Sequence, residues 1–107
     1  MSNLKEFEES DFQSQVLDSP KPVLVDFYAA WCGPCKIIEP FVEQAAGHLA
    51  GKVTVGKLDV DANPSIAARF GVMGMPTLGV FKGGKLVDRL VGYPGPAKVR
   101  AFLASIG

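Results

Sequence analysis

The 107-residue sequence has few cysteines, no excess of charge and no long apolar run. Its 11 basic and 11 acidic residues give a formal net charge of zero, so charge gives no indication of binding to nucleic acid, a membrane surface or a strongly charged substrate. No apolar run is long enough to span a bilayer. Residues 1–9 alternate apolar and charged types and hold no signal-peptide core. We therefore expect no nucleic-acid partner, no membrane partner and a cytoplasmic location.

Histidine and cysteine are too scarce for a closed zinc site within one chain. Such a site usually takes four ligands, whereas the sequence holds 2 Cys and 1 His. His48 falls in an amphipathic segment and is expected to be a solvated helix residue, although a metal shared between two chains stays open. We therefore expect no metal and no bound cofactor. The composition, 48% hydrophobic and 21% charged, is that of an ordinary globular protein, and the length predicts one domain over residues 1–107.

The two cysteines lie close together in the run Trp31-Cys32-Gly33-Pro34-Cys35. This run follows an apolar segment at 23–29 and opens an amphipathic one at 37–49, so it is predicted to lie where a buried strand turns into a helix. A helix start offers unpaired N–H groups and the positive end of the helix dipole, which favour the reactive thiolate. A structural disulfide fits less well, because stabilisation falls from about 3 kcal/mol as the closed loop becomes shorter than fifteen residues. The pattern therefore predicts thiol–disulfide exchange.

Hydrophobic spacing and turn residues predict an alternation of helices and strands. We expect helices over residues 10–17 with Ser10 as cap, over 37–49 with a kink at Pro40, from Asn63-Pro64 to Gly71, and from Pro96 onwards. We expect strands over residues 23–29, 53–60, 77–81 and 86–91, the last two joined by a hairpin turn at 82–85. A strand–helix–strand unit makes a right-handed parallel crossover, whereas the hairpin adds antiparallel strands. The predicted fold class is α/β: a central mixed β-sheet flanked by helices on both faces, with Cys32 at the carboxyl end of a central strand.

Asp26 and Pro76 are further candidates for the site. Asp26 interrupts an apolar strand, where burial raises the pKa of a carboxyl and suits it to accept a proton near neutral pH. An exposed strand end or a structural hydrogen bond is the alternative for Asp26. Pro76 follows Met75 at the start of a predicted strand. Taken alone, this pair indicates an ordinary trans turn, although a cis bond also occurs in such places.

Together these features resemble the thioredoxin family. The resemblance covers essentially the whole chain and rests on the motif at 31–36, the upstream run at 26–29, Lys57, the segment at 75–77 and Gly92. It implies a thioredoxin fold and a protein-disulfide reductase. Cys32 would be the exposed nucleophile, and Cys35 would be more buried and would resolve the mixed disulfide. Asp26 would take the proton from Cys35, Lys57 would tune Asp26, and Pro76 would be cis and face the two sulfurs.

The resemblance also implies a substrate-binding rim and an electron donor. Backbone groups around Met75 would bind the peptide of a client protein as an added strand. The rim would consist of Trp31, Gly33, Pro34, Met73, Gly74, Met75, Gly92 and Tyr93. The partners would be client proteins with disulfides and a thioredoxin reductase, a flavin-containing enzyme that passes on electrons from NADPH. The protein itself is expected to be a monomer.

Two positions depart from the family pattern, and two other functions stay open. Met75 stands where a branched aliphatic residue is usual, and we interpret it as a simple apolar substitution. Gly79 stands where a bulky aliphatic residue is usual, and it should weaken its strand or let another group approach closely. The same fold could act as an oxidase or isomerase, although Gly33-Pro34 favours a reductant. It could also be a binding module with incidental thiols, against which the complete set of catalytic residues argues.

Overall fold

The computed structural model describes residues 4–106, and within that range its centre is a five-stranded sheet in the order β1-β3-β2-β4-β5. The strands are β1 (Lys5–Glu6), β2 (Val23–Tyr28), β3 (Thr54–Asp59), β4 (Thr77–Lys82) and β5 (Lys85–Val91). β2 pairs parallel with β3 and antiparallel with β4. β1 pairs parallel with β3, and β5 pairs antiparallel with β4. The predicted mixed sheet is therefore confirmed.

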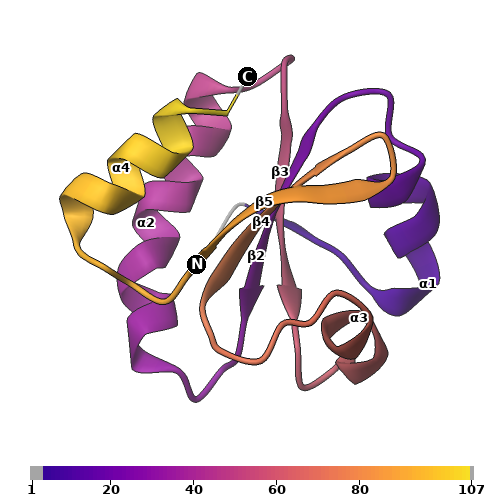
Figure 1. The fold of residues 1–107 in the computed structure, drawn as a ribbon, viewed down its shortest axis with the longest axis horizontal. Coiled ribbons are helices and arrows are strands. Elements are labelled where there is room, and N and C mark those ends of the chain that lie inside the picture. Colours follow the sequence, from indigo (N-terminus) through magenta and orange to yellow (C-terminus); the bar gives the residue numbers. More distant parts are fainter. Residues whose placement is uncertain (1–3, 107) are drawn as a thin grey trace.

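Helices cover both faces of this sheet, as predicted. They are α1 (Glu9–Phe12), which runs into a π-helical segment η1 (Gln13–Leu17), then α2 (Gly33–His48), α3 (Pro64–Arg69) and α4 (Pro96–Ala104). Figure 1 shows α2 and α4 on one side of the sheet and α1 and α3 on the other. Among residues 4–106, none of the helices is long and apolar enough to cross a membrane.

The alternation of side chains along β2 divides the hydrophobic core in two. Val23, Val25 and Phe27 belong to a cluster with side chains from α1, η1 and α3. Leu24 belongs instead to a cluster with side chains from α2 and α4. The strand is thus covered on both faces, as its apolar run predicts. Asp26 shares the face of Leu24, because alternate side chains of a strand point the same way, and its carboxyl lies on the α2 side of the sheet.

The N-terminal part of the fold differs from the sequence prediction. β1 was not predicted, because the strand is only two residues long and both residues are exposed. It is held by the buried side chain of Phe7, whose N–H donates to the carbonyl of Lys57 at 2.8 Å. The first helix begins at Glu9 rather than after Ser10. The N–H of Glu8 donates to the Asp11 carboxylate at 2.9 Å, so the predicted Ser10 cap is wrong.

Local sequence signals place the start of α3 and the turn between β4 and β5, but not the start of α2. α2 begins at Gly33, earlier than the apolar spacing indicated, and continues through Pro40, where the kink stays a prediction. α3 begins with Pro64 directly after Asn63, as predicted. The turn between β4 and β5 uses Gly83 and Gly84 at positive φ, 58° and 79°. Both angles suit the tight two-residue turns of β-hairpins, and glycine adopts them without strain.

Candidate redox site

A disulfide between Cys32 and Cys35 lies where β2 gives way to α2. Cys32 is the N-cap of α2 with an extended backbone, and Pro34 lies in the first turn, where its missing N–H removes no helical hydrogen bond. The Cα atoms of the two cysteines are 5.4 Å apart. The N–H of Cys35 donates to Sγ of Cys32 at 3.2 Å. The helix start therefore places a backbone donor on the sulfur of Cys32, as the position of the motif predicts.

Both cysteines are buried, which corrects one expectation. Cys32 and Cys35 each expose 4% of their surface, so Cys32 is neither open to solvent nor less buried than Cys35. The reason is the disulfide itself, which closes Cys32 back onto the first turn of α2, against the N–H of Cys35. The two residues still differ in position, because Cys32 precedes the helix and Cys35 lies inside it.

The predicted rim begins with two strongly exposed side chains. Trp31 is 70% exposed and Met73 is 91% exposed. The indole Nε1–H of Trp31 donates to the carboxylate of Asp61 at 2.8 Å. Asp61 was not singled out from the sequence, although a signal for it exists. β2 and β3 are parallel, so the segments that follow them meet at one edge of the sheet, and Trp31 and Asp61 lie in those segments.

The segment before β4 brings several predicted rim residues together. The Met75–Pro76 peptide bond is cis. The family resemblance implied this, and the trans turn inferred from the pair alone is wrong. The carbonyl of buried Pro76 accepts from the N–H of Gly92 at 2.7 Å, and Gly92 has a φ of 80°. The hydroxyl of Thr77 donates to the carbonyl of Gly74 at 2.6 Å.

An apolar hollow of about 480 Å³ lies beside this segment. Its lining residues come from the end of β3, from α3 and from the loop before β4: Val60, Pro64, Ala67, Ala68, Gly71, Val72, Met73 and Met75. Met73 and Met75 are rim residues, so the hollow adjoins the predicted client-binding surface. Tyr93 lies elsewhere: its ring is partly buried and its centroid is 6.2 Å from that of Phe41 on α2.

Asp26 is fully buried, which excludes the exposed strand end as its setting. Neither carboxylate oxygen has a hydrogen-bond partner among the described residues. The pKa of Asp26 is raised from 3.8 to about 7, chiefly by burial. Glu39 and Glu6 contribute to this rise, whereas Lys57, the register partner of Asp26 on β3, opposes it. Asp26 therefore has the pKa of a group that gives and takes protons near neutral pH.

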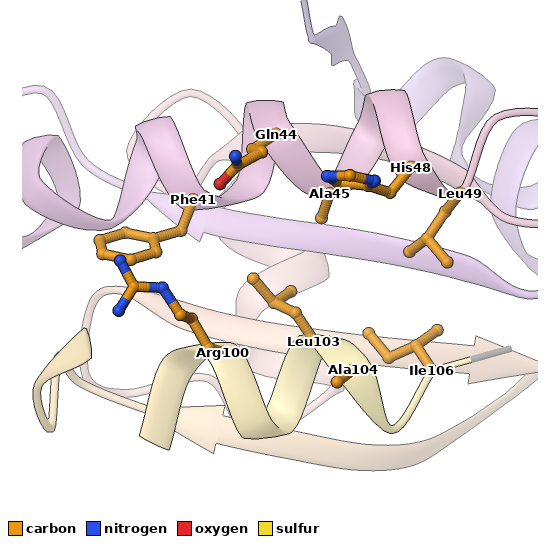
Figure 2. Close-up of a pocket in the computed structure, with 9 residues that line it drawn as sticks. All are labelled: Phe41, Gln44, Ala45, His48, Leu49, Arg100, Leu103, Ala104 and Ile106. Atoms are coloured by element: carbon orange, nitrogen blue, oxygen red, sulfur yellow. The ribbon is translucent and has the colours of Figure 1, made fainter. Parts of the chain in front are cut away.

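A second pocket lies away from the disulfide, between α2 and α4 (Figure 2). Its volume is about 280 Å³, and it is lined by Phe41, Gln44, Ala45, His48, Leu49, Arg100, Leu103, Ala104 and Ile106. At a rise of about 1.5 Å per residue, Ala45 is roughly 15 Å along the helix from Cys35. His48 is exposed, as predicted. Among residues 4–106, no group of three or more His, Cys, Asp or Glu side chains could hold a metal ion.

The space that a side chain at position 79 would take is filled by neighbouring side chains. A Cβ at this position would lie 3.0 Å from Leu86, 3.2 Å from Phe27 and 3.4 Å from Phe81. Of the two consequences considered for this glycine, the close approach of other groups is therefore the one found. The side chains of Leu86 and Phe27 take the room that a bulky aliphatic residue would need.

Comparisons with known proteins agree with the fold and the motif. The thioredoxin family model matches residues 3–105. A thioredoxin of Chlorobaculum thiosulfatiphilum is 51% identical over 90 residues, which are 82% of this chain and 83% of that protein. A thioredoxin of Alicyclobacillus acidocaldarius subsp. acidocaldarius is 49% identical over 98 residues, 92% of each chain. A bifunctional thioredoxin reductase/thioredoxin of Mycobacterium leprae is 46% identical over 101 residues, 94% of this chain and 22% of that protein.

Fold, motif and relatives thus point to one chemistry. The sheet order and its two helical layers place a Cys-x-x-Cys disulfide at a helix start. The family model covers nearly the whole chain, and relatives at about half identity align over most of it. The reaction at this site is dithiol–disulfide exchange between the Cys32–Cys35 pair and disulfides of other proteins. The chain therefore belongs to the thioredoxin family of thiol–disulfide oxidoreductases.

Proposed function

We propose a division of labour in this protein-disulfide reductase: Cys32 attacks the client and Cys35 resolves the intermediate. The observation that carries it is the hydrogen bond from the Cys35 N–H to Sγ of Cys32, at the start of α2. After reduction, that donor and the positive end of the helix dipole stabilise a thiolate on Cys32. Cys35 lies inside the helix, where its own sulfur has no such donor among the described contacts.

The exchange then takes two steps. The Cys32 thiolate attacks one sulfur of the client disulfide, a mixed disulfide forms, and the other client sulfur leaves as a thiolate and takes up a proton. The Cys35 thiolate attacks Sγ of Cys32, the Cys32–Cys35 disulfide forms, and the second client thiolate leaves. The client gains two electrons and two protons, and the protein ends as the disulfide found in the structure.

We propose that Asp26 accepts the proton of the Cys35 thiol. The ammonium of Lys57 would tune the pKa of Asp26. The support is the burial of Asp26 and its pKa of about 7, which lets the carboxylate accept a proton at neutral pH. Asp26→Asn should therefore slow the resolving step by about tenfold or more near pH 7. The effect should shrink at high pH, where the Cys35 thiol ionises without help. Stopped-flow reduction of a model disulfide measures this, and unchanged kinetics at pH 7 would remove Asp26 from the mechanism.

We propose that clients bind along the rim: Trp31, Gly33, Pro34, Met73, Gly74, Met75, Gly92 and Tyr93, with Pro76 beneath them. Trp31 and Met73 offer exposed apolar surface, and Met73 also lines the apolar hollow. The Met75 backbone makes no hydrogen bond to another of the described residues, so its N–H and carbonyl can pair with an extended client peptide. Tyr93, which packs near Phe41, would contribute at the margin of this surface.

We further propose that a thioredoxin reductase, with flavin and NADPH, returns the disulfide to the dithiol. The name of the Mycobacterium leprae relative combines thioredoxin reductase and thioredoxin in one protein, which supports such a partnership. A monomer in the cytoplasm is the setting that fits this role, because a reducing compartment keeps Cys-x-x-Cys pairs available for catalysis.

The assigned roles are tested by trapping. In a Cys35→Ser variant the mixed disulfide on Cys32 cannot be resolved, so client proteins should stay covalently attached and be released by added dithiothreitol. Cys32→Ser is the matched control and should trap none. Equal trapping by the two variants, or none by either, would show that Cys32 is not the attacking sulfur.

The direction of electron flow is tested by the redox potential. The Cys32–Cys35 pair is equilibrated with defined thiol buffers, and Trp31 fluorescence reports the oxidised fraction. A potential well below the cytosolic glutathione poise is expected of a reductant. A potential above that poise would make the protein an oxidase or isomerase on the same fold.

A further inference from the structure

Five ionisable side chains from β1, β2, β3 and α2 gather on one face of the sheet. Glu6, Lys57 and Asp26 are register partners across β1, β3 and β2, so their side chains leave the sheet on the same face. Glu39 reaches this row from α2. Tyr28, two residues after Asp26 on β2, donates its hydroxyl to Glu6 at 2.8 Å.

Lys57 is held by groups other than Asp26. Its Nζ lies 3.6 Å from Oε1 of Glu39, and it stands 5.0 Å from the centroid of the Tyr28 ring. Both side chains of the ion pair are half-buried, at 15% and 27% exposure, so solvent screens it only in part. Asp26, beside Lys57 in the sheet, has neither a hydrogen bond nor a salt bridge among residues 4–106. The one cation in register with Asp26 is therefore directed towards α2.

We propose that Glu39 is a positioning residue for the reaction: its carboxylate holds the Lys57 ammonium off Asp26 and so sets the charge around that buried carboxyl. The proposal rests on the proton-accepting role given to Asp26 above. Without Glu39, two carboxylates in this row remain for the ammonium: Asp26, which has no other partner among the described residues, and Glu6, which already accepts the hydroxyl of Tyr28. Lys57 would then stabilise the anion, and Asp26 would become a weaker base.

The charges that face Asp26 agree with this arrangement. Glu39 is the largest electrostatic cause of its raised pKa after burial, Lys57 opposes it, and Glu6 adds to it from β1. On the β4 side, the register partner of Asp26 is the apolar Leu78. Glu39 acts in two ways: through its own negative charge, and by competing for Lys57.

The test is a titration of the Asp26 carboxyl carbon by NMR in the oxidised protein. Glu39→Gln should lower the pKa of Asp26 by about one unit, as expected when a cation becomes free to pair with a carboxylate. Glu39→Asp keeps the charge and should restore most of the value. Glu9→Gln, which removes one negative charge on the opposite face of the sheet, is the control and should change nothing. An unchanged or raised pKa in Glu39→Gln would overturn the proposal.

Lys57→Met separates the two ways in which Glu39 can act. In that background Glu39→Gln should shift the pKa of Asp26 less than it does in the parent, because there is no ammonium left to relocate. Equal shifts in both backgrounds would mean that Glu39 acts only through its own charge and does not hold Lys57.

A kinetic readout distinguishes this proposal from the one on which it rests. If Asp26 accepts the proton of Cys35, the pH midpoint of the resolving step should fall in Glu39→Gln together with the pKa of Asp26. A lowered pKa with an unmoved midpoint would uphold the position of Glu39 and overturn the proton-accepting role of Asp26.

Discussion

Asp26 is a carboxyl whose ionisation the folded protein opposes. Its pKa is raised from 3.8 to about 7, chiefly by burial. Because the folded state binds this proton more tightly than the unfolded chain, the carboxyl disfavours folding only once the pH exceeds 3.8. The stability that depends on this carboxyl being protonated is therefore fully present below that pH. It is lost as the pH rises towards about 7. At about 1.4 kcal/mol per pKa unit, the loss is at most roughly 4 kcal/mol.

Asp26→Asn should therefore stabilise the protein at high pH. The amide cannot ionise, so the free energy of unfolding should exceed that of the parent by about 1 kcal/mol or more above pH 8, within the ceiling given above. Near pH 4 the difference should nearly vanish, because the parent carboxyl is then protonated as well. Urea unfolding of the oxidised proteins at the two pH values measures this. An equal gain in the free energy of unfolding at both pH values would show that ionisation of Asp26 is not the cause of the gain.

At the scale of residues, the sequence predicted which residues belong to the site better than it predicted their burial and contacts. The cysteine pair and the buried acid are visible in the sequence because their neighbours are apolar or helix-starting. The buried state of Cys32 was missed, because exposure depends on how the disulfide closes onto α2. Glu39 was missed as well, because its approach to Lys57 joins a helix to a strand 18 residues further on.

Gly56 shows how one residue decides the packing of a whole element. It lies in β3 opposite Lys5 of β1. A Cβ there would lie 2.5 Å from the Phe7 ring and 2.7 Å from the carbonyl oxygen of Lys5. Backbone and a buried ring cannot both move without cost, so β1 and Phe7 can dock only against a glycine.

Gly56→Ala should therefore destabilise the protein by about 1–3 kcal/mol, the usual cost of overpacking. The matched control is Gly47→Ala in α2, where a Cβ meets nothing within 4 Å. Alanine is the better helix former, so this control should stabilise by about 0.5–1 kcal/mol. Denaturant unfolding of both variants compares them directly. Gly56→Ala as stable as the parent would mean that β1 is not packed against Gly56.

At the scale of elements, long apolar or periodic segments were predicted and short ones were not. β2 and α2 carry enough apolar residues to define their type from the sequence. β1 does not, because two exposed residues show no pattern and the strand exists through Phe7 and its pairing with β3. The start of α1 was misplaced because the Glu8 N–H bonds to Asp11, which leaves Ser10 inside the helix.

At the scale of the whole molecule, Arg89 connects parts that lie far apart in the chain. Its guanidinium donates to the carbonyls of Phe70 at 2.9 Å and Gly71 at 3.3 Å. Those carbonyls end α3, where unpaired acceptors and the negative end of the helix dipole favour a cation. β5 is thereby tied to the segment that leads to the proposed client-binding rim.

Arg89→Ala should lower the free energy of unfolding by about 1 kcal/mol and speed amide exchange at residues 70–72. Lys85→Ala, which removes an exposed cation from the same strand, should stay within about 0.5 kcal/mol of the parent. Chemical unfolding and hydrogen exchange measure the two effects. Equal behaviour of both variants would show that the contact with α3 adds nothing.

β5 also forms an outer edge of the sheet, with β4 as its partner strand among the described residues. An uncovered edge offers free backbone groups to any passing strand. Here Lys85, Asp88 and Arg89 place charge along the edge, and the register shift between Val80 and Phe81 marks a bulge in the hairpin. Two molecules meeting edge to edge would have to desolvate these charges and to pair along an irregular ladder. The charges and the bulge of the β4–β5 hairpin therefore also disfavour fibrous aggregation at high concentration.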